Sequence, residues 1–284
     1  MSRSFQLGMS LPDEPLIRIR SGRVWTLIDL HDVWAHSELF YFLVWRDLKV
    51  RYKQTILGAS WVILQPLLMT VIFVVFLGMI VRVYTPGVPY PLFLYSALLP
   101  WTFFSNAVAS SSYSLIAASQ VITKVYFPRV LIPAAVVTVR LSDFVIAFIF
   151  LIPLIAYYDV RPTWKLIFLP LLVVQLTLLA LGVGLWSAAL NVKYRDVGTI
   201  IPVLLQLWMF VSPVVYPSSM VPVRWRIVYN FNPLAGLINN FRSSLLGTPF
   251  NGWSLAISAV ITVVVLVSAV IVFRRVEDEF ADVI

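Results

Sequence analysis

The chain has 284 residues, of which 60% are hydrophobic and only 12% are charged, and its mean hydropathy is +0.90. A soluble domain of this size cannot bury so much apolar surface, so the composition excludes a water-soluble globular protein. Cysteine is absent, which excludes disulfides, thiolate metal sites and cysteine nucleophiles and leaves the redox compartment open. The net charge of +8 permits a nucleic-acid partner, and only the distribution of the basic residues decides that question.

The N-terminal segment, residues 1–26, fits no recognisable motif, and we expect it to be cytoplasmic and of unknown role. The first strongly apolar stretch begins only near residue 59 and is followed by five more. We therefore expect neither a cleavable signal peptide nor an exported soluble domain.

Residues 27–58 are predicted to form an amphipathic interfacial helix followed by a basic mouth. Within 27–51, aromatic side chains such as Trp34 and Trp45 are interrupted by acids such as Glu38. This mixture is typical of a helix that lies on the membrane and sinks one face into the headgroup boundary.

Four basic residues gather at this mouth: Arg46, Lys49, Arg51 and Lys53. Because Arg46, Lys49 and Lys53 recur at spacings of three and four residues, they would share one face of a continuous helix. The cluster is explained either by membrane topology and contact with anionic headgroups, or by a cationic site for the phosphate-bearing head of a substrate. The sequence leaves both readings open.

Six apolar segments are close to 20 residues or longer, the length of helix that crosses a hydrocarbon core about 30 Å thick. They are residues 59–81, 90–118, 131–158, 166–190, 197–217 and 254–273. The sequence therefore predicts an all-α membrane protein with six transmembrane helices. We expect one compact membrane domain over 59–273 and a cytoplasmic tail over 274–284.

The basic residues are distributed unevenly between the connections. With both termini placed in the cytoplasm, that side holds Arg3, Arg18, Arg20, Arg23, Arg46, Lys49, Arg51, Lys53, Lys124, Arg129, Lys193, Arg195, Arg274 and Arg275. The opposite side holds Arg82, Arg161, Lys165, Arg224, Arg226 and Arg242. This positive-inside asymmetry predicts an even number of spans with both termini in the cytoplasm. Because topology explains the basicity, we expect no nucleic-acid partner.

The second cytoplasmic connection, residues 119–130, is short and of mixed character. Pro128 disfavours helical backbone at Phe127, so we predict a short surface helix over 119–126 and a break before the third span. Such a segment is either a docking site for a cytoplasmic partner or an ordinary turn with positive anchor residues.

Arg140 and Asp143 lie inside the third predicted span. A charge in hydrocarbon costs about 2.5 to 3.5 kcal/mol even on the lower insertion scales, so we expect this pair to face each other, the bundle interior or water. The pair is either structural or part of a substrate path or proton relay. No other predicted span carries an acid, which disfavours a proton-coupled transporter.

The fifth predicted span is interrupted by Pro202, Pro213 and Pro217, and the connection after it is long and moderately apolar. Two amphipathic pieces in this connection, 223–229 and 233–246, are too short to cross a bilayer. We predict re-entrant or interfacial helices there, which either close a pore on the outer face or form a structural lid.

Aromatic residues make up 14% of the chain, and several lie inside the predicted spans. Trp101 and Phe104 share one helix face after Pro100, where they either line a passage for sugar rings or belong to the core or a lipid-facing belt.

Catalytic constellations are absent from the sequence. The two histidines, His31 and His36, are five residues apart and fall on different helix faces, so we expect no metal site. Because the sequence has no Gly-x-x-x-x-Gly-Lys-Ser/Thr segment, it cannot bind ATP through a P-loop of its own. If the chain pumps a substrate, the energy must come from another subunit or from an ion gradient.

An ordered series of short motifs resembles the permease of type-2 ABC polysaccharide exporters, which carry O-antigen, capsule and teichoic acid. The series begins with the run from Arg51 to Trp61 and Gln65-Pro66. It continues with Leu99-Pro100-Trp101, Lys124-Val125-Tyr126-Phe127-Pro128-Arg129, Asn191-Val192-Lys193-Tyr194-Arg195-Asp196, Ser212-Pro213-Val214-Val215-Tyr216 and Asn232-Pro233-Leu234. The resemblance covers nearly the whole chain from about residue 27 onward, with the motifs in order.

The resemblance implies a six-span permease in the bacterial inner membrane that forms a homodimer around a channel. It implies no enzymatic activity and no cofactor on this chain, with ATP and Mg²⁺ held by two copies of a separate ATP-binding subunit. That subunit would dock on the amphipathic helix and on the coupling residues Ser119, Gln120, Lys124, Tyr126, Phe127 and Arg129. The helices after the fifth span would form the outer gate.

The resemblance also implies a lipid-linked substrate, a polysaccharide or polyol-phosphate chain on a polyprenyl pyrophosphate. Its head would suit Arg46, Lys49, Arg51 and Lys53. The expected channel lining is Tyr95, Trp101, Phe104, Trp208, Phe210 and Tyr216.

Two rival classes of transporter stay open. A type-2 ABC permease for a drug or another lipid shares the six-span plan, whereas a secondary transporter would show internal repeats or buried ion-binding carboxylates, and the sequence shows neither.

Overall fold

The structure, a computed structural model, describes residues 34–53, 58, 60–81, 85, 87–124, 127–161 and 163–277. The predicted segment 1–26, residues 27–33 of the predicted surface helix, Tyr126 and residues 278–284 of the predicted tail lie outside the described residues.

Every regular element in the described part of the chain is helical. The α-helices are α2 (Ser37–Lys53), α3 (Ser60–Phe73), α4 (Tyr90–Ala117), α5 (Ser119–Ile122), α6 (Leu131–Tyr157), α7 (Leu169–Lys193), α8 (Asp196–Val211), α9 (Arg226–Asn230), α10 (Pro233–Leu246) and α11 (Gly252–Glu277). The π-helix η1 (Val74–Ile80) continues α3, and the 3₁₀ turns are η2 (Trp164–Phe168), η3 (Ser218–Met220) and η4 (Val223–Trp225). The prediction of an all-helical membrane protein is confirmed at this level.

Within the described residues, five helical stretches are long and apolar enough to cross a bilayer. They are Ser60–Ile80, Tyr90–Ala117, Leu131–Tyr157, Trp164–Lys193 and Gly252–Glu277. The helix predicted over the fifth span, 197–217, is shorter in the structure, because α8 ends at Val211 after 16 residues. At 1.5 Å per residue, the 16 residues of α8 span only about 24 Å. The helix ends because Ser212 precedes Pro213 and takes an extended conformation, with φ −103° and ψ 153°.

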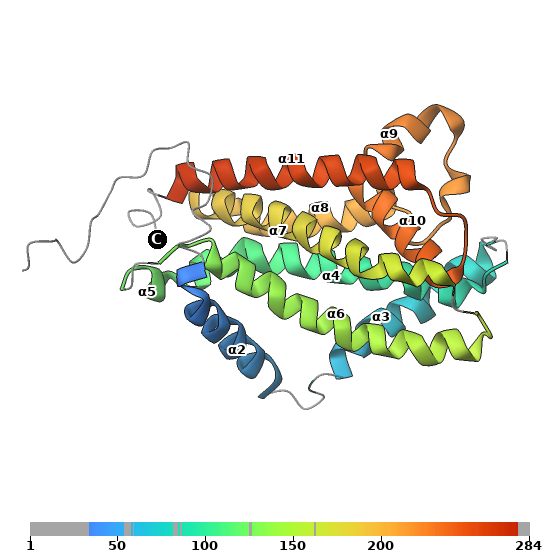
Figure 1. The fold of residues 1–284 in the computed structure, drawn as a ribbon, viewed down its shortest axis with the longest axis horizontal. Helices are drawn as coiled ribbons and strands as arrows, with labels where there is room; N and C mark the ends of the chain where they lie inside the picture. The colour runs from blue at the N-terminus through green and yellow to red at the C-terminus, as the bar shows by residue number, and fades with distance from the viewer. Residues whose placement is uncertain are drawn as a thin grey trace, which may run out of the picture.

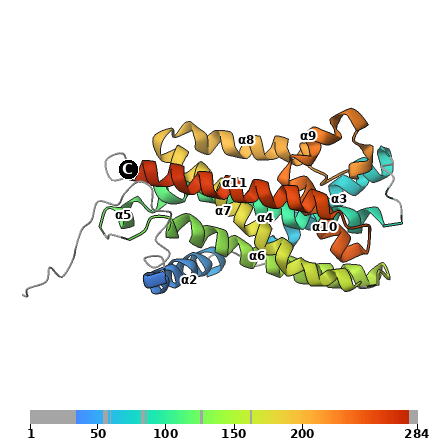
Figure 2. The ribbon, with the colours of Figure 1, turned by 45° about the horizontal axis from the view of Figure 1, so that its top comes forward.

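The long helices lie side by side and define two ends of the bundle (Figure 1). One end, here the α5 end, carries α5, the turn between α7 and α8, and the C-terminal end of α11; the other, the α10 end, carries α9 and α10 (Figure 2). The helix α4 occupies the centre, since 78% of its most apolar stretch is buried, against 11% for α3 with η1.

Small residues bring the central helices close together. A Cβ on Gly182 would meet the backbone of Leu266 at 3.1 Å, and one on Gly184 would meet Ser111 at 2.9 Å. Close backbone approach of this kind is how helices associate where lipid supplies no hydrophobic driving force. These glycines therefore hold α7 against α11 and α4.

Asn191 fastens the turn between α7 and α8 to the central helix. Its side-chain Nδ2 donates to the carbonyl of Ser112 at 2.7 Å, and its Oδ1 accepts from the backbone N–H of Gly198 at 2.8 Å. Asn191 is fully buried, so the first residue of one of the motifs acts as a structural polar link.

The helix α2 contacts the bundle with one face. Leu43 is buried against a cluster at the α5 end that includes Ile122 and Phe127. Trp34, Tyr41 and Phe42 are between 59% and 81% exposed. A helix is thus present over most of the region where the amphipathic one is predicted, with a large aromatic surface free for lipid.

The helix α10 begins and ends at residues suited to those positions. Asn232 Oδ1 accepts from the N–H of Leu234 as an N-cap, Pro233 follows, and Gly247 ends the helix with φ +71°. Short helices occur where the pieces 223–229 and 233–246 are predicted, although α10 is buried almost throughout rather than amphipathic at a surface.

Gly236 is the tightest contact between α10 and α11, and it gives a test of this packing. We expect Gly236→Ala to lower stability by about 1 to 3 kcal/mol, because its Cβ would overlap Ser258 Oγ and lie 2.5 Å from the carbonyl oxygen of Ser254. Gly252→Ala, with no atom within 4 Å of the added Cβ, is the matched control. The midpoint of thermal unfolding in detergent should fall for the first variant alone. Equal midpoints would show that α10 does not pack on α11 at this position.

Candidate functional site

A charged cluster lies where α2, α4 and α6 meet, with Asp143 at its centre. Asp143 Oδ2 accepts from Arg51 of α2 at 2.8 Å and from Arg140 of its own helix at 3.4 Å. Arg140 also donates to Ser110 Oγ of α4, with its Nε at 3.1 Å. One carboxylate is thus shared by two guanidinium groups, which leaves one positive charge in excess.

Tyr52 completes the shell around this carboxylate. Its hydroxyl donates to Asp143 Oδ1 at 2.5 Å. Partial burial and the hydrogen bond to Asp143 raise the pKa of Tyr52 to about 12, so the hydroxyl remains a donor at physiological pH. The last turn of α2 is therefore fixed to α6 by two side chains that follow each other in the chain.

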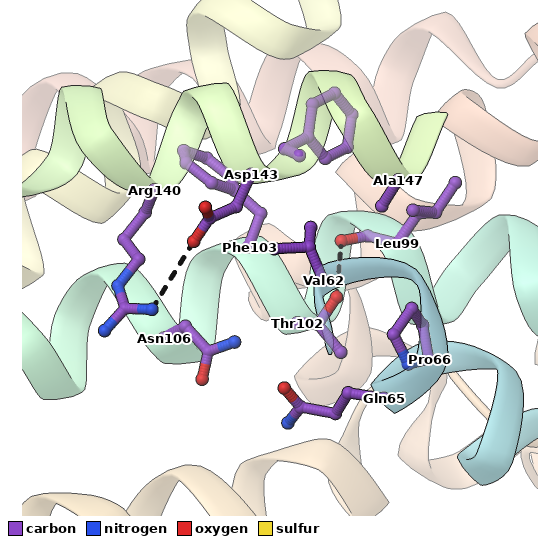
Figure 3. A pocket seen from close by; sticks show the side chains of 11 residues that line it. Val62, Gln65, Pro66, Leu99, Thr102, Phe103, Asn106, Arg140, Asp143 and Ala147 are labelled. Carbon is purple, nitrogen blue, oxygen red and sulfur yellow. Dashed lines mark hydrogen bonds and ion pairs between the residues drawn. The ribbon is translucent and has the colours of Figure 1, made fainter. Parts of the chain in front are cut away.

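Two cavities adjoin the cluster. The larger, about 270 Å³, lies between α2, α4 and α6. Its charged lining residues are Arg46, Asp47, Arg51 and Arg140, and Ser110, Tyr113 and apolar residues of α6 also line it. The smaller, about 30 Å³, is shown in Figure 3, where Arg140 and Asp143 of α6 face Asn106 and Thr102 of α4 and Gln65 of α3. Arg51 and Arg140 of the cluster thus reach a space on the α2 side whose charged lining is three arginines and one aspartate.

The four basic residues predicted to form one mouth are divided in the structure. Arg46 pairs with Asp47 at 2.8 Å, and Arg51 reaches Asp143, whereas Lys49 and Lys53 are exposed. By spacing, Arg46, Lys49 and Lys53 still share one side of α2 and Arg51 lies on another, so spacing alone does not produce this division. The structure brings Arg46 and Arg51, but neither lysine, to the larger cavity.

The six aromatic residues predicted to line a channel also divide. Tyr95 and Phe104 have no exposed surface and Trp101 has 5%; all three belong to the core around α4. Within this single chain they pack against neighbouring helices, and their assignment to the channel lining stays a prediction. Tyr95 Oη donates to the carbonyl of Ala147 at 3.0 Å, which gives this aromatic residue a structural role. Phe210 is 53% exposed, and Trp208 and Tyr216 are half-buried.

The predicted coupling segment forms α5 at one end of the bundle, a single turn that ends at Ile122 rather than near residue 126. Gln120 and Lys124 are exposed, and Ser119 is half-buried. Phe127 is buried in the cluster at the α5 end, and Arg129 contacts Glu277 of α11 through its backbone N–H and its guanidinium. Among the described residues of the predicted coupling set, only Gln120 and Lys124 are thus exposed.

Sequence reasoning missed two residues whose partners are distant in the chain. Tyr52 follows Arg51 in a motif, but its contact with Asp143 is visible only once α2 is packed on α6. Arg242 was counted among the extramembrane charges, yet it is 5% exposed. Because its helix is too short to cross a bilayer, the sequence predicted that Arg242 would lie outside the membrane and did not predict its burial. Among the described residues, no group of three His, Asp or Glu side chains converges on a metal-sized site.

Comparison with known proteins places these features in a wider group. Residues 38–246, from α2 to the end of α10, match the model of the ABC-2 type transporter family. The chain is 27% identical over 248 residues to the O-antigen export system permease protein RfbA of Klebsiella pneumoniae, across 87% of this chain and 95% of that protein. It is 30% identical over 257 residues to RfbA of Myxococcus xanthus, across 89% and 98%. It is 24% identical over 246 residues to the polysialic acid transport protein KpsM of Escherichia coli, across 82% and 91%.

Asp143→Asn tests whether the shared carboxylate holds α2 in place. The substitution keeps the shape of the side chain but removes the negative charge between Arg51 and Arg140. We therefore expect the free energy of unfolding to fall by about 1.5 to 3 kcal/mol. Hydrogen–deuterium exchange should rise in α2 and stay unchanged in α11. Asp47→Asn breaks a more exposed pair and should change stability by less than about 0.5 kcal/mol. Exchange in α2 that is equal in the two variants would contradict the central role of Asp143.

Proposed function

Because the chain belongs to the ABC-2 type transporter family, we propose that it is the membrane permease of an ATP-driven polysaccharide exporter. The observation that carries this proposal is the alignment with O-antigen and polysialic acid permeases along nearly the full length of both partners. The substrate is a polysaccharide of the O-antigen, capsule or teichoic-acid type on a polyprenyl pyrophosphate lipid. The chain itself carries out transport and no enzymatic step.

We further propose that the chain crosses the bacterial inner membrane six times. In this arrangement α8 and the non-helical residues after it make the fifth crossing, α2 lies at the interface, and α9 and α10 stand at the outer face. The α5 end is cytoplasmic, and so are both termini. The support is the charge at the α5 end, which carries Lys124, Lys193, Arg195, Arg274 and Arg275, as the positive-inside rule requires.

The assembly contains two copies of this chain and two ATP-binding subunits. The sequence has no P-loop, so ATP and Mg²⁺ belong to the partner subunit, which docks on α5 through the exposed Gln120 and Lys124 and the adjoining Ser119. Apolar residues of α3 and α8 such as Val71, Ile72 and Leu207, each close to half or more exposed, suit both lipid and a second copy.

Within this assembly, the passage is lined by Trp208, Phe210 and Tyr216, the aromatic residues of the predicted set that retain exposed surface. Arg46, Lys49, Arg51 and Lys53 meet the phosphates of the lipid-linked substrate from the α2 side. The excess positive charge around Asp143 supports this position, because it attracts anionic groups from the membrane surface.

Deletion of the gene in its native host tests the proposed export. Surface polysaccharide should disappear while its lipid-linked form accumulates inside the cell, and the wild-type gene should restore export. Deletion of the ATP-binding subunit should give the same phenotype. Unchanged surface polysaccharide would point to a permease for a drug or another lipid. Export that continues without the ATP-binding subunit would point to a secondary transporter.

A further inference from the structure

The chain leaves regular helical structure at the α10 end, where α8 stops short. Residues 212–217 follow Val211 without forming a helix, and residues 212–215 are buried. Non-helical backbone at membrane depth is stable only where protein groups satisfy its carbonyls. The donors to this segment therefore control how it is held.

Side chains from two other helices bond successive groups of this segment. Arg242 Nη2 of α10 donates to the carbonyls of Pro213 and Val214, at 3.0 and 3.4 Å. Tyr90 Oη of α4 donates to the carbonyl of Val215 at 2.9 Å.

Asn232, the N-cap of α10, binds the preceding residues of the same segment. Its Nδ2 donates to Ser212 Oγ at 2.9 Å and to the carbonyl of Val211 at 3.4 Å. Its Oδ1 also accepts from Trp208 Nε1 of α8 at 3.0 Å. The polar residues of two motifs thus meet at the break after α8.

Arg242 is the only one of these donors that is charged. Its Nε donates to the carbonyl of Phe93 of α4 at 3.3 Å, and its Cζ lies 3.5 Å from the centre of the Phe93 ring. No ion pair joins it to a carboxylate within the described residues. A buried cation of this kind is costly, and in membrane proteins such a residue marks function by default.

We propose that Arg242 is a releasable latch that holds the α10 end closed by joining α10, α4 and the segment after α8. The link to transport rests on the proposed export function, whereas the contacts of Arg242 do not. The planar guanidinium with five N–H donors bonds three carbonyls at once, which a lysine ammonium on a single flexible stem cannot reproduce. When the segment moves away, water hydrates the cation and offsets the lost bonds. An apolar side chain would gain nothing from this exchange.

The chain has no cysteine, so a single introduced thiol reports on the latch. Val215 is 4% exposed, and Val215→Cys keeps its backbone carbonyl. Maleimide labelling of the purified chain in detergent should be slow with Arg242 present. Adding Arg242→Met should speed labelling by about tenfold or more, because hydrogen bonds to a charged donor are lost from the closed state. Adding Arg242→Lys should give an intermediate rate.

Two controls separate a latch from general loosening. Asn240→Ala removes a bond within α10, to the carbonyl of Gly236, and a bond from α10 to the carbonyl of Asn251. It should leave labelling of Val215→Cys unchanged. A second reporter, Ala269→Cys in α11, is fully buried and should stay protected in each Arg242 variant.

Wild-type labelling rates in both Arg242 variants would overturn the proposal, and so would equal acceleration by Asn240→Ala or exposure of the Ala269→Cys thiol. The labelling rates are measured without substrate or ATP, so they do not depend on the outcome of the deletion experiment. If the export proposal fails, the labelling result still decides whether Arg242 holds the segment after α8.

Discussion

The structure depends on one constraint: inside the hydrocarbon layer, the protein itself must satisfy every backbone polar group and every charge. Straight helices meet this demand along most of the chain. In the part of the chain that the structure describes, two places need more than this: the charged cluster around Asp143 and the non-helical segment after α8. At each of them, side chains from several helices converge, and these contacts determine how α2 and α10 are placed.

The central helix α4 supplies hydrogen-bonding groups to both places, the charged cluster and the segment after α8. Toward the α5 end it offers Ser110 to Arg140, and toward the α10 end it offers Tyr90 and the carbonyl of Phe93 to the segment after α8 and to Arg242. Its burial follows from this position, since it is surrounded by α3, α6, α7, α8 and α10. The buried helix α4 therefore contacts a polar junction near each of its ends.

The sequence predicted the features that depend on local pattern. The apolar stretches 90–118 and 131–158 are found as Tyr90–Ala117 and Leu131–Tyr157, because length and hydropathy alone determine which segments fit a bilayer. The sequence indicated an interruption at Pro213, but the predicted helix still extended past it. The apolar side chains continue through Val214 and Val215, whereas the helical conformation of the backbone ends at Val211.

Features that depend on packing could not be predicted. Asp143 was paired with its neighbour Arg140, whereas its shorter contact is with Arg51, on another helix. Trp101 and Phe104 share a helix face in either reading, and only the surrounding helices show that this face is buried. Arg242 appeared to be a solvated charge because α10 has only 14 residues; its partners are carbonyls, which no pattern of side chains reveals.

The central claim is that α8 and the segment after it complete a crossing despite the short helix, which makes the total even. Single cysteines in place of Asp196 and Met220, both exposed at opposite ends of this stretch, test it directly in intact cells with a membrane-impermeant maleimide. The account predicts that the Met220→Cys chain is labelled from outside and the Asp196→Cys chain only after permeabilisation. Labelling of both from the same side would contradict it and leave five crossings, with the termini on opposite faces.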